Sequence, residues 1–286
     1  MLDLSIVIVS WNARDFLRKC LISLQRATSE LRSEIIVVDN ASADGSPEMV
    51  QEEFPGVQLI QTGQNLGFAK GNNVGIRKSQ GRYVALINSD VEVPADTIKQ
   101  LISFLDQHRE AGIVGPKIYG GDGRIQSSCF RSPNFRNTIC QTFALYRLAP
   151  GSSLLSGWEM KDWTYDVVRE VDVLSGCFWV VRKQAMDQVG LLDEGFFMYG
   201  EDLDWCHRFH KSGWKVMFYP HASATHYGGG SSAKAPVKFF IEMQKANRRY
   251  WKKHYGVLGN IFFSCIIFLS QTVRLIPRLL QFLVQP

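Results

Sequence analysis

Three acids, Glu201, Asp202 and Asp204, stand within four consecutive positions of the chain. The first two are adjacent at the expected start of a short helix, where the helix dipole favours the charged form of a carboxylate. A general base must be ionised before it removes a proton from a hydroxyl group, so this position suits a base. Helix capping is the alternative interpretation, but three acids are more than a cap requires.

A second candidate group consists of Asp90 and His226. Asp90 closes the tripeptide NSD after an apolar run, and His226 lies between the strand-like run Lys215 to Tyr219 and the glycines Gly228–Gly230. Mg²⁺ usually takes one or two carboxylates plus substrate phosphates, and Asn88 can add a weaker carbonyl contact. The alternatives are an Asx turn for the tripeptide and a buried core histidine. With the three acids, this group points to metal-assisted transfer of an activated group.

Polar residues also follow the strand-like run Ile35 to Val38, where Asp39 and Asn40 precede a turn. A carboxylate there can accept a hydrogen bond from a pyrimidine N–H or a ribose hydroxyl, or it can simply serve a helix cap and turn. The segment Asn65 to Gly75 has glycines four residues apart, but it matches neither GxGxxG nor the P-loop. It allows close helix packing, or it places Asn65 and the helix start against a nucleotide.

The elements that must position these residues alternate between strands and helices. Helix-period segments separate the apolar runs, which predicts an α/β fold with a mostly parallel central sheet covered by helices on both faces. The carboxyl ends of the strands then meet at one edge, where open α/β sheets bind ligands. The stretch from about residue 120 to 169 has no clear pattern. The predicted strands are Ile6–Val9, Ile35–Val38, Val57–Ile60, Tyr83–Ile87, Cys177–Val181 and Lys215–Tyr219.

Length and composition agree with one large α/β domain, or one domain with an appendage. A chain of 286 residues with 45% apolar and 21% charged residues is an ordinary globular protein and not a disordered one. Six cysteines without a CxxC pair argue against a zinc knuckle and a disulfide framework, and suit a reducing compartment. Because no charged and then apolar leader opens the chain, we expect a cytoplasmic protein.

The tail is basic and partly apolar. From Lys234 onward there are nine Lys and Arg residues and one acid, a charge of +8, whereas the remaining 233 residues carry −3. This asymmetry favours surface targeting by the tail over nucleic-acid binding. Residues 257–273 are mostly apolar with basic flanks, which suits a helix lying in a membrane interface. Spanning the membrane, or packing on the body or on a partner chain of a homodimer, are the alternatives. We therefore expect a catalytic domain over 1–233 and a helical tail over 234–286.

Taken together, these motifs resemble the inverting nucleotide-sugar glycosyltransferases of the family-2 type, which have a GT-A fold. Within that family the chain is similar to bacterial rhamnosyltransferase-like enzymes that build surface polysaccharides. The resemblance covers about residues 3 to 232. It depends on SIVIVSWN, VVDNASADGS, NLGFAKGNNVG, INSD, GLLDEGFFMYGEDLDW and the later His226.

The resemblance implies a role for each candidate residue. Asp202 matches the catalytic base, with Glu201 beside it, and Asp90 and His226 match residues that hold Mg²⁺ or Mn²⁺ on the pyrophosphate. One departure is that Asn88 stands where a DxD motif has its first Asp. Asp204 and Trp205 are the candidates for acceptor contact. The candidates for donor contact are Ser10, Trp11, Asn12, Asp39, Asn65, Gly67, Phe68, Gly71, Asn72, Asn88 and Ser89.

The implied reaction is a single in-line displacement. A sugar moves from a nucleotide-diphosphate sugar, dTDP-rhamnose or a UDP-sugar, to a hydroxyl of a lipid-linked or polysaccharide acceptor at the inner face of the cell membrane. Backbone N–H groups of Gly228–Gly230 could stabilise the departing diphosphate or close over the donor. The competing interpretation is a non-catalytic nucleotide-sugar-binding scaffold at the membrane. A nicotinamide oxidoreductase is disfavoured because GxGxxG is missing.

Overall fold

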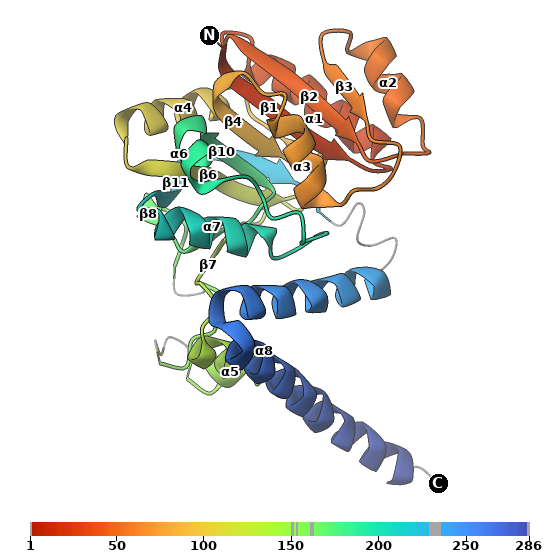
Figure 1. Cartoon of the computed structure of the whole chain (residues 1–286), viewed down its shortest axis with the longest axis vertical. Helices are drawn as coiled ribbons and strands as arrows, with labels where there is room; N and C mark the ends of the chain where they lie inside the picture. The colour runs from red at the N-terminus through yellow and green to blue at the C-terminus, as the bar shows by residue number, and fades with distance from the viewer. Residues whose placement is uncertain (1, 150–151, 153, 161–162, 229–235, 285–286) are drawn as a thin grey trace.

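The computed structural model describes residues 2–149, 152, 154–160, 163–228 and 236–284, with only the helical backbone for 236, 238 and 274–284. The predicted domain boundary at residue 233 and the predicted loop residues Gly229 and Gly230 lie outside the described residues. The described chain forms an α/β body and a long C-terminal helix (Figure 1).

A nine-stranded sheet forms the centre of the body, in the order β3-β2-β1-β4-β10-β6-β11-β5 with β8 beside β11. On one side of the sheet, β1 (Leu2–Ser10) pairs in parallel with β2 (Ser33–Asp39) and β4 (Gly81–Ile87). The edge strand β3 (Gln58–Gln61) pairs in parallel with β2. These four strands confirm the predicted runs, each within a few residues of its predicted bounds.

The other side of the sheet mixes strand directions. Strand β10 (Phe178–Arg182) runs antiparallel to both β4 and β6 (Ala111–Gly120), and β6 pairs in parallel with β11 (Lys215–His226). The short strands β5 (Val91–Glu92) and β8 (Arg169–Glu170) both pair antiparallel with β11. Six of the nine strands therefore point the same way, and the predicted mostly parallel α/β sheet is confirmed.

Alternation along β1 assigns side chains to the two faces of the sheet. Leu4, Ile6 and Ile8 belong to a core that packs under α1, α2 and α4, whereas Val7 belongs to the opposite core under α3, α6 and α7. Both faces are therefore covered, as predicted. The helices are α1 (Arg14–Ala27), α2 (Ser46–Glu53), α3 (Phe68–Ile76), α4 (Thr97–Gln107), α6 (Lys183–Val189) and α7 (Glu201–Lys211).

Strand β11 is longer than the predicted Lys215–Tyr219, and this extension carries His226 to the end of the sheet. Pro220 interrupts the apolar pattern, which is why the sequence alone predicted the shorter strand. The pairing with β6 shifts register between Tyr219 and Ser223, so the strand continues past the proline through an irregularity.

Several elements were not predicted because glycine, proline and polar residues interrupt their apolar patterns. Strand β6 has the sequence AGIVGPKIYG, yet its first six residues are buried in the sheet. The irregular region after it contains helix α5 (Phe135–Thr142) and a two-stranded sheet of β7 (Cys129–Phe130) and β9 (Val173–Leu174), with a 3-10 turn at Leu145–Arg147.

The C-terminal helix α8 (Pro236–Val284) bends at Gly256, whose φ of 68° is not helical. Figure 1 shows its first half running beneath α7 and its second half turning away beside α5, in agreement with its contacts to both helices. By length and composition alone, Phe239–Val273 qualifies as a membrane-crossing helix, and only 17% of its most apolar stretch is buried. The bend at Gly256 lies within Phe239–Val273.

Candidate active site

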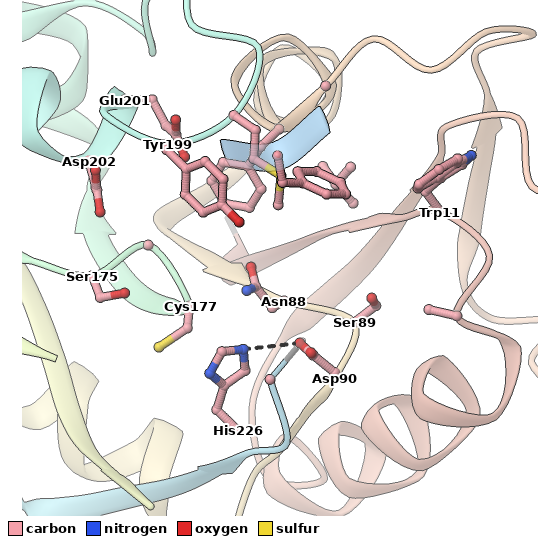
Figure 2. A pocket seen from close by; sticks show the side chains of 18 of the residues that line it. Trp11, Asn88, Ser89, Asp90, Ser175, Cys177, Tyr199, Glu201, Asp202 and His226 are labelled. Atoms are coloured by element: carbon pink, nitrogen blue, oxygen red, sulfur yellow. Dashed lines mark ion pairs between the residues drawn. The ribbon is translucent and has the colours of Figure 1, made fainter. Parts of the chain in front are cut away.

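A cavity of about 320 Å³ opens at the carboxyl end of the central strands. The ends of β1, β4 and β11, the residues just before β10, and the starts of α3 and α7 all contribute to its wall (Figure 2). This is the edge where open α/β sheets bind ligands. The predicted residues that line the cavity are Trp11, Asn65, Gly67, Phe68, Asn88, Ser89, Asp90, Glu201, Asp202 and His226.

Strand pairing brings Asp90 and His226 together although 135 residues separate them in the chain. The antiparallel pairing of β5 with β11 places Val91 opposite His226, so the preceding Asp90 lies beside the imidazole. His226 Nε2 is 3.2 Å from Asp90 Oδ1 (Figure 2), and His226 Nδ1 is 3.1 Å from Gln126 Oε1. An Nδ1–H that donates to Gln126 leaves the Nε2 lone pair facing Asp90 and the cavity.

The donor set around Asp90 fits a divalent cation that is shared with a substrate. A carboxylate and an imidazole nitrogen lie 3.2 Å apart, and Asn88 Oδ1 is buried without a hydrogen-bond partner. Among the described residues no group of three His, Cys, Asp or Glu side chains could hold a metal ion. The protein therefore offers at most a partial coordination shell, as is usual for a cation that also binds substrate phosphates.

Glu201 and Asp202 line the opposite part of the cavity, at the first turn of α7. Burial raises the pKa of both carboxyl groups, and the negative charge of Asp202 adds to the rise for Glu201, whose pKa lies well above its usual range. The backbone N–H of Leu203 donates to Asp202 Oδ1 at 2.8 Å, which stabilises the charged form of Asp202. Glu201 Oε2 is buried without a partner.

These environments raise the pKa of Glu201 more than that of Asp202. Glu201 loses the most solvation and has no hydrogen-bond donor on Oε2, so it retains its proton more readily. Asp202 accepts hydrogen bonds from backbone N–H groups, which oppose the rise of its pKa, so it loses its proton more readily than Glu201 does. Two adjacent carboxyl groups whose environments push their pKa values apart are the arrangement expected of a base and a neutral neighbour.

The side of the cavity that the sequence predicts to bind the donor depends on the turn before α3. Gly67 has a φ of 79°, and a Cβ there would lie 2.2 Å from the carbonyl oxygen of Phe197. Asn65 Oδ1 accepts a hydrogen bond from the Gly67 N–H, and Asn40 Nδ2 donates to the Gly67 carbonyl. This network shapes the turn that presents Asn65 and Phe68 to the cavity. One effect of Asn65 is therefore to hold the backbone of this turn in place.

Ser10 and Asn12 do not line the cavity, which corrects their prediction as donor contacts. Ser10 is fully buried in the last position of β1. Asn12 has a φ of 51°, its N–H donates to Ser42 Oγ, and its Oδ1 accepts from the backbone N–H of Ala43. Asn12 therefore fastens the loop after β1 to the loop after β2, and of these three neighbours only Trp11 reaches the cavity.

Gly71 and Asn72 are corrected in the same way. A Cβ on Gly71 would lie 3.0 Å from Val9, so the glycine is needed for the close approach of α3 to β1. Asn72 is buried, and its side-chain amide donates to the Phe68 carbonyl within the helix. The packing interpretation of the glycine-spaced segment therefore holds for the body of α3, and its start alone lines the cavity.

Asp39 is 2% exposed at the end of β2 and is not part of the cavity wall. Its Oδ2 accepts a hydrogen bond from the Ser42 N–H, as in the turn interpretation. Its Oδ1 is buried without a partner, so the carboxylate keeps one free acceptor.

Asp204 and Trp205 lie away from the cavity, and their prediction as acceptor contacts is wrong. Trp205 is fully buried in the core, where its Nε1 donates to the Gly190 carbonyl. Asp204 is also fully buried, and its carboxylate binds Lys253 and His254 of α8. Successive residues of a helix are rotated by about 100°, so Asp204, two positions beyond Asp202, points to another face of α7.

Several residues of the cavity were missed by the sequence analysis. Gln126 lies in the region without a clear pattern, and Phe239 lies in the tail, so nothing in their local sequence indicated a role. Tyr199 adjoins the acid pair and Asn40 adjoins Asp39, and their positions within the quoted motifs were the available signal. Cys177 also lines the cavity, and burial raises the pKa of its thiol to about 12, which keeps it neutral.

Comparison with known proteins gives a consistent result. Residues 5–153, just over half of the chain, match the family described as Glycosyl transferase family 2. The chain is 29% identical over 262 residues to the N-acetylglucosaminyl-diphospho-decaprenol L-rhamnosyltransferase of Mycobacterium tuberculosis, covering 85% of this chain and 82% of that protein. It is 25% identical over 255 residues to the rhamnosyltransferase WbbL of Escherichia coli K12, covering 86% and 91%.

Solved structures share the fold at low sequence identity. The crystal structure of GalNAc-T7 with UDP, GalNAc and Mn²⁺ superposes with a TM-score of 0.62 and 17% identity, covering 90% of this chain and 50% of that one. At this identity the likeness concerns the fold alone.

Proposed function

The chain belongs to glycosyl transferase family 2 and has the GT-A fold, and we propose that it transfers a sugar from a nucleotide-diphosphate sugar to an acceptor hydroxyl in cell-surface glycan synthesis. The observation that carries the proposal is the convergence of Asp90, Asp202 and His226, from the β4–β5 turn, α7 and β11, on one cavity. The names of the two rhamnosyltransferase relatives support dTDP-rhamnose as the donor, with a UDP-sugar as the alternative.

The donor diphosphate is proposed to lie between Asp90 and the start of α3. Asp90 and His226 would hold Mg²⁺ or Mn²⁺, with Asn88 nearby. When bound, the cation would neutralise negative charge on the departing nucleoside diphosphate. Trp11 and Phe68 offer apolar surface to the donor, and Asp39 Oδ1 offers a buried acceptor to the base, provided that the nucleotide reaches behind the cavity wall.

The transfer is proposed to be a single displacement with inversion. Asp202 takes the proton of the acceptor hydroxyl as its oxygen attacks the anomeric carbon, and the bond from that carbon to the diphosphate breaks. The raised pKa of Glu201 favours its protonated form, which would limit the negative charge near the attacking oxygen. The neutral thiol of Cys177 is a poor nucleophile, so it offers no route through a covalent sugar intermediate.

The second half of α8 is proposed to lie on the inner face of the cell membrane. Its exposed apolar side chains include Val257, Leu258, Ile261 and Phe268, and basic residues precede it. Such a helix binds anionic lipid surfaces, which suits an acceptor carried on a polyprenyl lipid. Pairing of two copies through the same face is the alternative use of this surface.

The test uses the purified full chain in detergent with dTDP-rhamnose or UDP-N-acetylglucosamine, and an N-acetylglucosaminyl-diphospho-prenol as acceptor. We expect transfer that requires Mg²⁺ or Mn²⁺ and falls about 100-fold or more in Asp90→Ala, because general electrostatic stabilisation of this kind is worth two to three orders of magnitude. Asp96→Ala, which removes an exposed acid outside the cavity, is the matched control. Nucleotide-sugar binding without turnover would instead favour the scaffold interpretation.

A further inference from the structure

We propose that the C-terminal helix α8 supplies one wall of the acceptor subsite through Phe239, which packs on Tyr199 beside the acid pair. This inference rests on the proposed function and assigns the acceptor side of the same cavity. It makes the tail helix part of the active site as well as a candidate membrane contact.

Tyr199 occupies an unusual backbone position at the edge of the cavity. Its φ is 67°, and that of the following Gly200 is 79°, so two successive residues adopt the left-handed conformation before α7 begins. A bulky residue rarely adopts this conformation unless its surroundings hold it there, and such positions cluster at ligand-binding sites. Figure 2 shows the Tyr199 hydroxyl pointing into the cavity. No described residue forms a hydrogen bond with that hydroxyl.

Phe239 is the one residue in the described part of α8 that lines the cavity. Its ring meets the ring of Tyr199 edge to face, with centroids 6.3 Å apart and an interplanar angle of 81°. Phe239 is 6% exposed, whereas its neighbour Phe240 is 51% exposed. The two aromatic rings therefore form a continuous wall, and Phe239 contributes to it from outside the domain predicted to be catalytic.

Close packing holds this wall in place relative to Asp202. A Cβ on Gly200 would lie 3.2 Å from the ring of Phe196 and 3.3 Å from Ala246 of α8, so the turn before α7 rests directly on the tail helix. Tyr250 and Trp251 are fully buried in the same cluster.

Buried ion pairs hold α7 and the loop before it against α8. Asp204 of α7 accepts hydrogen bonds from Lys253 at 2.7 Å and His254 at 2.8 Å, and the Asp204 side chain is fully buried. Asp193, in the loop before α7, binds Lys253 at 2.7 Å and Arg249 at 2.9 Å. Because these contacts span both the loop and the helix, movement of α8 would displace the first turn of α7 and its acid pair.

The position of the wall favours the acceptor over the donor. Tyr199 lies three residues before Asp202, the base that must reach the acceptor hydroxyl, and across the cavity from Trp11 (Figure 2). Aromatic faces pack on the C–H faces of sugar rings. Beyond Phe239 the exposed apolar side chains Val237 and Ile241 extend along α8, which suits an acceptor sugar attached to an apolar carrier.

The test is a KM and kcat comparison of Phe239→Ala with the matched control Phe240→Ala, using dTDP-rhamnose or UDP-N-acetylglucosamine and a short-chain N-acetylglucosaminyl-diphospho-prenol. Phe239→Ala is expected to raise the acceptor KM about tenfold, a loss in line with removal of one aromatic contact. The Kd of the nucleotide sugar and the slow hydrolysis of donor by water should stay within about twofold of wild type. Phe240→Ala should leave all three quantities unchanged.

Two further variants separate a binding role from a folding role. Phe239→Leu keeps an apolar side chain but loses the flat ring, so it is expected to fold and still raise the acceptor KM. Phe239→Tyr, which keeps the ring, should have an acceptor KM close to that of wild type. If wild type transfers the sugar, the proposed function stands. An acceptor KM unchanged in Phe239→Leu, or a parallel loss of donor affinity, would then overturn the inference alone. Absence of transfer by wild type would overturn the proposed function itself and the inference with it.

Discussion

The two faces of helix α7 carry acids whose pKa values are shifted in opposite directions. On the cavity face, burial raises the pKa of Glu201 and Asp202, and no lysine, arginine or histidine among the described residues pairs with either carboxylate. On the tail face, burial also opposes ionisation of Asp204, but hydrogen bonds from His254 and Lys253 outweigh it and hold its pKa well below the usual range. The sequence EDLD gives no sign of this difference.

The difference shows what each carboxylate can do. Asp204 is surrounded by cations from α7 and α8, so its charge is committed to holding the two helices together. Asp202 has only backbone donors, so its lone pairs remain available for a proton from a ligand. We propose that the buried acids without a cationic partner take part in the reaction, whereas the paired Asp204 stabilises the contact between α7 and α8.

The substitution Asp202→Asn tests the cavity face of α7 and has the largest expected effect. The amide keeps the size of the side chain but cannot take a proton, so transfer is expected to fall about 1,000-fold. The Kd of the nucleotide sugar, measured by calorimetry with Mn²⁺, should remain near the wild-type value. An equal loss of donor affinity would show that Asp202 binds the donor and would remove the base assignment.

Asp204→Asn tests the other face and should act on stability. Removing one partner of a buried charge cluster leaves Lys253 and His254 without their anion, and we expect a loss of about 3 kcal/mol in the free energy of unfolding. Chemical denaturation measures this loss. The control is Asp187→Asn, which breaks the exposed i,i+4 pair with Lys183 and should cost less than about 0.5 kcal/mol.

The same cluster gives the sign of a pH effect. Because the pKa of Asp204 is lower in the folded state than in the unfolded state, its contribution is complete above the unfolded value of about 3.9 and is lost as pH falls below it. The stability difference between wild type and Asp204→Asn should therefore shrink under acid conditions. A difference that stays constant down to pH 3 would count against the ion cluster as its source.

The fold could be predicted from sequence where apolar runs are uninterrupted. Strands such as β1 and β4 read as continuous apolar segments because both of their faces are buried, and the intervening helices have a clear apolar stripe. Strand β6 and the end of β11 were missed because Pro116 and Pro220 break the pattern locally, while pairing with neighbouring strands restores it. That pairing is a tertiary property and leaves no local signal.

The site could be predicted only for residues inside motifs. Asp90, Asp202 and His226 were identified by type and context, and their convergence on one cavity required strand pairing over long distances. Assigning Asp204 and Trp205 to the acceptor failed because the direction of a side chain on α7 depends on what packs on each face. Phe239 could not be predicted, since its role depends on where the tail helix docks.

Glu201→Gln is expected to have the smallest effect on transfer, and it distinguishes a neutral Glu201 from a charged one. If Glu201 keeps its proton at neutral pH, glutamine reproduces its neutral state, and transfer should stay within about tenfold of wild type, far above Asp202→Asn. The variant should also differ in the pH dependence of stability. Because the folded-state pKa of Glu201 is raised, its favourable contribution is complete below the unfolded value of about 4.3 and is lost as pH rises toward the folded value.

Glutamine has no proton to lose, so Glu201→Gln should gain stability relative to wild type as pH rises from 4 to 8, as measured by denaturation at a series of pH values. A gain that appears only below pH 4 would give the opposite sign and contradict a raised pKa. Equal inactivity of Glu201→Gln and Asp202→Asn would mean that both carboxylates must be charged. The distinction between a neutral Glu201 and an ionised Asp202 would then fail, although the contrast with Asp204 on the tail face would remain.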